Sequence, residues 1–142
     1  MRERNGIPSG REVARPFVVA ILVALGGAGL LFAHSRLLRS APREKAELSA
    51  PPKQIELWFD ELLDRAFNRV EVFPAAELRS KNRPNLTVGQ PKLDPEDRTH
   101  LIANLAPLSP GDYMVEWQVL SRDGHSVRGR FAFRILAPPG KR

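Results

Sequence analysis

The alternation of apolar and polar side chains near the end of this chain constrains its fold more than any other feature. Between residues 113 and 121, one set of alternate positions is apolar or aromatic: Tyr113, Val115, Trp117 and Val119. Residues 127–135 continue the pattern, and one face of that run carries three arginines: Arg128, Arg130 and Arg134. Successive side chains of a β-strand point to opposite faces of a sheet, so a period of two indicates strands rather than helices. The alternation therefore predicts two antiparallel strands, each buried on one face.

Shorter runs with strand-like patterns precede this pair, at residues 53–59, 69–73 and 99–105. Turns rich in proline and glycine separate them, and the 142 residues include 13 prolines and 10 glycines. Because proline inside a helix costs about 3 kcal/mol, this composition disfavours a helical bundle. Short strands divided by frequent turns are typical of an all-β sandwich. Residues 60–67 are compatible with one helical turn or with a loop.

The first 33 residues differ from the rest of the chain. Residues 1–16 are polar and carry four arginines, and residues 17–33 contain no charge. A helix over residues 17–33 would rise about 25 Å, which is short for a hydrocarbon core of about 30 Å. This order is typical of a secretory signal peptide, so we predict cleavage after Ala33, with an uncleaved membrane anchor as the alternative. The predicted parts are then a leader (1–33), a β-sandwich domain (34–137) and a frayed tail (138–142).

Charge and cysteine content exclude several classes of function. The net charge is +6, but part of it belongs to the leader, and Arg128, Arg130 and Arg134 are predicted to lie on a solvated strand face. No basic run is interleaved with exposed aromatic residues, as single-strand binders require, so we expect no nucleic-acid binding. The chain has no cysteine. Disulfides, thiolate zinc sites, iron–sulfur clusters and cysteine nucleophiles are therefore excluded.

One candidate site combines the predicted new N-terminus with a turn. His34 would offer its free amine and its imidazole as a chelate. Gly124 permits a sharp turn between Asp123 and His125, whose side chains could then lie on the same side. Three nitrogens and one oxygen in a tetragonal set favour Cu(II). The alternative is an ordinary hairpin turn next to an unrelated leader boundary.

Two stretches carry a resemblance to the CopC family of periplasmic copper-resistance proteins. Residues 111–129 read GDYMVEWQVLSRDGHSVRG, similar to the family pattern G-x-Y-x-V-x-W-x-V-x-S-x-D-G-H-x-x-x-G. Residues 34–42 read HSRLLRSAP, similar to the mature start H-A-x-L-x-x-S-x-P, with Ser35 in place of alanine. Residues 55–61 also resemble the L-x-F-x-E region of the family.

The resemblance implies a fold, a metal and a set of ligands. It implies a Greek-key β-sandwich of about seven strands with a cupredoxin-like layout, located in the bacterial periplasm. It also implies one Cu(II) ion held by His34, Asp123 and His125. Some family members carry a methionine-rich segment for Cu(I). Here Met114 is the only methionine after residue 33, so no thioether site is expected.

The predicted function is therefore extracytoplasmic Cu(II) binding, for copper sequestration or delivery in resistance or homeostasis. We expect no enzyme activity, because four protein ligands fill the equatorial plane and no nucleophile–base pair stands out. The family resemblance implies a CopD-type inner-membrane protein as partner, and we expect a monomer. The rival prediction is a membrane-anchored interaction domain without a metal. A third option is copper redox chemistry, since oxidative polysaccharide-cleaving enzymes also use an N-terminal histidine chelate.

Other residues have simpler expected roles. His100 lies outside the motif, and we expect it at the surface or behind the ligands, with an auxiliary ligand role as the alternative. Asp60 and Glu61 are expected to hydrogen-bond within a loop. The core is predicted to hold four large aromatic residues: Trp58, Trp117, Phe131 and Phe133. Tyr113 is a candidate corner tyrosine, whose hydroxyl bonds the nearby backbone.

Overall fold

The computed structural model describes residues 36–139. Within them the chain forms eight strands and one short 3-10 helix, η1. Their bounds are β1 Leu37–Ala41, β2 Glu47–Leu48, β3 Gln54–Phe59, β4 Arg69–Pro74, η1 Ala75–Glu77, β5 Thr87–Leu93, β6 His100–Leu105, β7 Gly111–Leu120 and β8 Ser126–Ile135. The predicted all-β architecture is confirmed, and the only helical element among these residues is η1.

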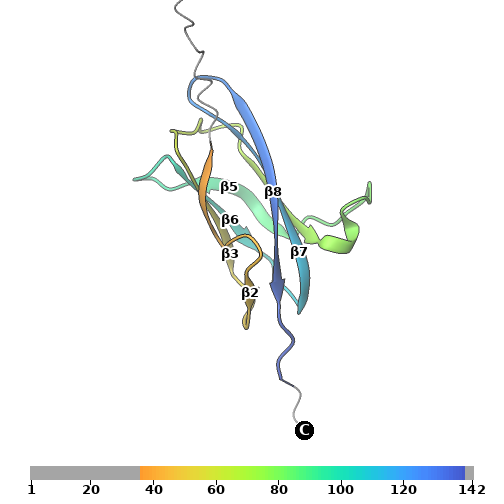
Figure 1. Ribbon diagram of the computed structural model, residues 1–142. Coiled ribbons are helices and arrows are strands. Elements are labelled where there is room, and N and C mark those ends of the chain that lie inside the picture. The colour runs from red at the N-terminus through yellow and green to blue at the C-terminus, as the bar shows by residue number, and fades with distance from the viewer. Residues whose placement is uncertain (1–35, 140–142) are drawn as a thin grey trace, which may run out of the picture. The chain divides into compact units, whose positions relative to one another are not determined.

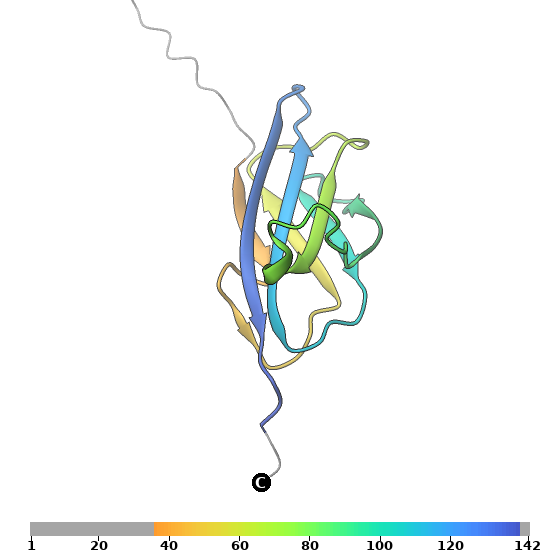
Figure 2. The ribbon, with the colours of Figure 1, turned by 90° about the vertical axis from the view of Figure 1, so that its right-hand side faces the viewer.

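The strands form two sheets that face each other (Figures 1 and 2). The first sheet has the order β1-β3-β6-β5, and the second has the order β2-β8-β7-β4. Neighbouring strands are antiparallel, except that β2 runs parallel to β8. The chain crosses from the first sheet to the second three times, between β1 and β2, between β3 and β4, and between β6 and β7. Each sheet contributes the side chains of its inner face to one core between the two sheets.

The core follows the alternation that the sequence predicts. Its largest fully buried side chains come from both sheets and from the β3–β4 loop: Phe59, Phe133, Ile55, Leu57, Leu63 and Leu101. Phe73 is also fully buried but is not part of this cluster, and its ring lies against the Arg83 guanidinium. Burying a side chain of this size is worth about 1.5–3 kcal/mol. Trp117 packs edge-on against Phe59, with ring centroids 5.2 Å apart. A Cβ atom on the facing Gly129 would lie 2.3 Å from the Trp117 ring, so glycine leaves the room that the indole needs.

Several detailed predictions are confirmed in this core. Trp117, Phe131 and Phe133 are buried. The Tyr113 hydroxyl donates a hydrogen bond of 2.8 Å to the Ser109 carbonyl, as expected of a corner tyrosine. The core assignment of Trp58 is wrong, because its side chain lies on the face of β3 opposite to the buried residues and is half-buried there. Residues 60–67 form a loop rather than a helical turn.

Five predicted strands are present with ends shifted by one or two residues, and three strands were not predicted: β1, β2 and β5. β5 contains Gly89 and Pro91 and lies at the edge of the first sheet, where proline is tolerated. Its sequence does not alternate regularly between apolar and polar residues, so no pattern predicted it. β2 has only two residues. No helix within residues 36–139 has the length and apolar character needed to cross a membrane. The predicted leader, His34 and the last three residues of the tail lie outside the described residues.

Candidate metal centre

The hairpin between β7 and β8 presents the Asp123-Gly124-His125 motif. The Gly124 N–H donates to the Ser121 carbonyl at 2.9 Å, and the Ser121 N–H donates to the His125 carbonyl at 2.9 Å. Gly124 has a φ of +92°, which a residue with a Cβ rarely adopts. This is the geometry of a short hairpin loop whose last residue is left-handed. The predicted turn is confirmed, and its backbone geometry sets the positions from which the side chains of Asp123 and His125 project.

The turn brings the side chains of Asp123 and His125 together. Oδ2 of Asp123 lies 2.9 Å from Nδ1 of His125, and the two side chains are 49% and 60% exposed. Two adjacent ligand atoms at about 2.0 Å from one ion and at right angles would be separated by about this distance. The Asp123–His125 pair is therefore preformed at a spacing that suits coordination, and it is open to solvent.

Hydrogen bonds hold the Asp123 carboxylate in its ionised form. The Ser121 hydroxyl donates to Oδ1 of Asp123, and the His125 backbone N–H donates to the same oxygen at 3.2 Å. Together with the His125 ring, and with Ser121 as the largest contributor, these donors lower the pKa of Asp123 to about 2. Asp123 is thus a negatively charged oxygen donor throughout the physiological range of pH.

The loop between β3 and β4 lies against this hairpin. Leu63 forms a β-bridge with Ser121, and the Arg122 N–H donates to the Leu62 carbonyl at 2.9 Å. A shallow hollow of about 280 Å³ is lined by Glu61, Leu62, Arg122 and Asp123. From the sequence, Glu61 is expected only to hydrogen-bond within its own loop. Its place beside Asp123 depends on the pairing of two distant segments, which no local pattern reveals.

The start of the described chain is tied to the same loop. The Arg36 N–H donates to Oδ1 of Asp60 at 2.6 Å, and the Asp60 N–H donates to the Arg36 carbonyl at 3.1 Å. Figure 2 shows the beginning of β1, the β3–β4 loop and the β7–β8 hairpin at one end of the sandwich. Two residues of extended chain span at most about 7 Å. The expected ligand His34 lies outside the described residues, and Arg36 is fixed at the end where the other two expected ligands lie.

His100 lies in a different cluster, on the outer side of the first sheet. Its ring stacks on Trp58, with centroids 4.2 Å apart and planes 9° from parallel. Nδ1 lies 3.2 Å from the Asp94 carboxylate, and Nε2 lies 2.8 Å from the Glu56 carboxylate, an ion-pair contact that is not aligned as a hydrogen bond. The expected surface position of His100 is wrong, because its side chain is only 10% exposed.

Metal ligands are sparse in the described part of the chain. Within residues 36–139, no three side chains of His, Cys, Asp or Glu are grouped so that they could hold one metal ion. The expected ligand set of three residues is thus represented there by the Asp123–His125 pair, and His34 would have to complete it.

Comparisons with known proteins agree with the resemblance in the sequence. Residues 37–136 match the family model described as the CopC domain. The chain is 30% identical over 120 residues to protein YobA of Escherichia coli strain K12, covering 84% of this chain and 92% of that protein. It is 31% identical over 118 residues to copper resistance protein C of Pseudomonas syringae pv. tomato, covering 80% of this chain and 93% of that protein.

A solved structure shows the same fold. The crystal structure of CopC from Methylosinus trichosporium OB3b superposes with a TM-score of 0.65 at 26% identity. The match covers 77% of this chain and 100% of that one. The family model spans both sheets and the Asp123-Gly124-His125 hairpin. The chain belongs to the CopC family.

Proposed function

We propose that this protein binds one Cu(II) ion outside the cytoplasm and sequesters or delivers it in copper resistance or homeostasis. The observation that carries the proposal is the Asp123–His125 pair, 2.9 Å apart and open to solvent at the tip of the β7–β8 hairpin. The pair lies within the region that matches the CopC domain. A relative of similar length is named copper resistance protein C.

The ligand set favours the oxidised copper ion. Two imidazoles, one carboxylate and the amine of His34 are nitrogen and oxygen donors, which suit Cu(II). The chain has no cysteine, and Met114 is the only methionine after residue 33. Met114 pairs with Ala132 in the second sheet, six registers from the Leu120–Ser126 pair that closes the hairpin. Soft sulfur donors for Cu(I) are therefore not gathered at this end of the sandwich.

Further parts of the proposal follow from this ligand set. Cleavage after Ala33 would expose the amine of His34, leaving a periplasmic domain over residues 34–137 and a short tail. Four protein ligands would leave no open equatorial position, so we propose a carrier rather than an enzyme. A monomer that passes copper to a CopD-type inner-membrane protein fits this role. Nucleic acid has no part in it.

The mature N-terminus decides between the proposal and its rival. The intact mass of the exported protein should correspond to a chain that begins at His34. Cu(II) electron paramagnetic resonance of that protein should show three nitrogen ligands. Because residues 17–33 are free of charge, the rival is a membrane-anchored interaction domain without a metal. A protein that retains Met1 would exclude the amine ligand and favour that rival.

The pH dependence of copper binding tests the amine separately. An α-amine has a pKa of about 7.7–8.0 and must lose its proton to bind a metal. We expect Cu(II) affinity to fall steeply as the pH drops from neutral to mildly acidic values. Acetylation of the N-terminal amine, as a control, should weaken binding and flatten this dependence. An affinity that does not change over this range would contradict a role for the amine.

A further inference from the structure

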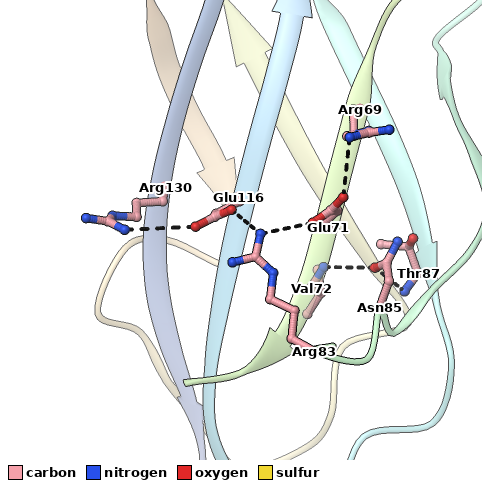
Figure 3. A network of polar contacts seen from close by, with 8 residues as sticks. All are labelled: Arg69, Glu71, Val72, Arg83, Asn85, Thr87, Glu116 and Arg130. Atoms are coloured by element: carbon pink, nitrogen blue, oxygen red, sulfur yellow. Dashed lines mark hydrogen bonds and ion pairs between the residues drawn. The ribbon is translucent and has the colours of Figure 1, made fainter. Parts of the chain in front are cut away.

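The outer face of the second sheet carries a network of charged side chains (Figure 3). The guanidinium of Arg83 lies between two carboxylates, with Nη2 at 3.1 Å from Glu71 and 2.5 Å from Glu116. These three side chains are 24–29% exposed. The same guanidinium lies 4.0 Å from the centroid of the Phe73 ring. Arg83 is thus held in place, and its charge is matched by the two glutamates.

Other arginines surround this network without being neutralised by it. Arg69 lies 3.8 Å from Glu71 and is 74% exposed, and Arg130 lies 3.9 Å from Glu116 and is 62% exposed. Ion pairs that are this long and this exposed to solvent contribute little to the free energy of folding. Arg128 has no carboxylate within ion-pair distance in the described part of the chain. A groove of about 470 Å³, called the arginine groove below, is lined by these charged residues and their neighbours: Arg69, Glu71, Arg83, Glu116, Trp117, Gln118, Arg128, Gly129 and Arg130.

The groove borders a stretch of strand edge that has no partner among residues 36–139. Strand β2 pairs with β8 only at Arg134 and Ile135, and the Lys45 N–H reaches the Ala132 carbonyl at 2.7 Å. No strand within the described residues pairs with residues 126–131 on the side away from β7. An unpaired edge offers backbone donors and acceptors to another extended chain.

The alternation of backbone groups identifies which residues of this edge are available. The Arg134 N–H donates to the Ala46 carbonyl, so the backbone groups of Arg134 and Ala132 point toward β2. In an antiparallel pair the backbone groups of every second residue point to the same side. Arg128 and Arg130 therefore direct both their N–H and their C=O groups to the open edge. The same two residues also line the arginine groove.

We propose that the open edge of β8 binds an acidic, extended segment of a partner protein as an added strand. The backbone of that segment would pair with Arg128 and Arg130. Carboxylates on one of its faces would lie beside the side chains of Arg128 and Arg130 on the neighbouring strand. Strand addition of this kind takes affinity from main-chain hydrogen bonds and specificity from alternate side chains. The charge of the groove selects an acidic segment.

The observations favour this occupant over three others. A second copy of the chain would place its own Arg128 and Arg130 against the same residues, and like charges on paired strands are destabilising. Nucleic acid and an anionic membrane present continuous negative charge, which would meet the carboxylates of Glu71 and Glu116 among the residues that line the groove. A peptide can instead place carboxylates only where arginines lie.

The surface is next to the candidate metal centre but does not depend on it. β8 begins at Ser126, directly after His125, so a strand added at this edge would reach the hairpin. A partner bound here would lie beside the copper. Binding of the segment itself requires no metal, so this inference and the proposed copper site can fail separately.

A peptide-binding experiment tests the inference. The probe is a fluorescein-labelled peptide of four Glu-Thr repeats, and fluorescence anisotropy is measured with the exported protein, both metal-free and loaded with Cu(II). We expect binding in both states and much weaker binding of a matched Gln-Thr peptide. The double variant Arg128→Gln/Arg130→Gln should raise the Kd at least tenfold. Arg134→Gln is the matched control, because Arg134 lies on the same strand outside the groove and pairs with Asp112.

Backbone pairing and alternative ligands are tested with further probes. A Glu-Thr peptide that is N-methylated at every residue has no backbone N–H on either edge, so it cannot form the main-chain ladder and should lose binding. Circular dichroism checks that each variant is folded. The inference would be overturned by equal affinity for the N-methylated peptide, or by equal losses in Arg134→Gln and the double variant. Absence of peptide binding, or tighter binding to phosphatidylglycerol vesicles or single-stranded DNA than to the peptide, would also overturn it.

Discussion

Two histidines of this protein lie beside carboxylates at similar distances, yet their surroundings differ. Nδ1 of His125 is 2.9 Å from Asp123, and its side chain is 60% exposed at the tip of a hairpin. His100 is 10% exposed, stacks on Trp58 and has a carboxylate facing each ring nitrogen. A metal could reach His125 without disturbing the fold. At His100 it would have to displace existing partners, so a short histidine–carboxylate distance is not sufficient to indicate a metal site.

The sharpest test of this comparison exchanges each histidine for alanine and measures Cu(II) affinity by competitive titration. His125→Ala removes a proposed ligand. Loss of a group that merely orients a ligand costs about 10–100-fold in affinity, so we expect a loss of more than about 100-fold here. His100→Ala should leave the affinity within a few-fold of the unaltered protein. Equal losses in the two variants would mean that the wrong histidine has been assigned to the metal.

When stability is measured instead of Cu(II) affinity, His100→Ala should be the variant with the larger loss. His100→Ala removes the stack on Trp58 and the contacts of the buried ring with the carboxylates of Glu56 and Asp94. We expect the free energy of unfolding, from urea denaturation of metal-free protein, to fall by about 1–3 kcal/mol. His125→Ala should change it by less than about 0.5 kcal/mol, as is usual for an exposed site. A His100→Ala protein with the same free energy of unfolding as the unaltered protein would show that the His100 cluster contributes little to stability.

The two histidines also show what the sequence could and could not predict. His125 follows a turn motif, and the position of its side chain depends on a hairpin formed by neighbouring residues. Local pattern was therefore enough to predict that it lies beside Asp123. His100 contacts Asp94 across the turn before β6. Its contact with Trp58 depends on the register of two neighbouring strands, β3 and β6. Register between strands far apart in sequence leaves no local mark, so its burial was not predicted.

The same reason explains the successes and failures in the fold. β7 and β8 alternate over ten residues each, and both were predicted. β2 and β5 are short or interrupted edge strands, formed because a neighbouring strand offers its edge, and both were missed. Trp58 was assigned to the core for its size, although its place in the alternation of β3 puts it on the outer face. Period is a better guide to burial than residue size in such strands.

A smaller effect on the hairpin is expected from Ser121→Ala. The Ser121 hydroxyl donates to the Asp123 carboxylate, and the serine is buried, so alanine fits without a large cavity. Asp123 would lose one of the groups that orient it, and we expect Cu(II) affinity to fall about tenfold. Ser126→Ala is the matched control, because the Ser126 hydroxyl accepts from Gln118 and not from the metal-centre residues. Equal affinities for Ser121→Ala and the unaltered protein would contradict an orienting role for the hydroxyl.

The smallest expected effect concerns the buried histidine and acid stability. The Glu96 backbone N–H, and then the His100 ring, lower the pKa of Asp94 below its usual value. A carboxyl with a lowered pKa in the folded state stabilises the protein above its unfolded pKa of about 3.9, and this contribution is lost as the pH falls below it. The stability difference between pH 6 and pH 3, from urea denaturation, should therefore be smaller in Asp94→Asn than in the unaltered protein. Identical differences in both proteins would show that the His100 cluster does not respond to acid through Asp94, and that its packing on Trp58 alone distinguishes it from the exposed Asp123–His125 pair.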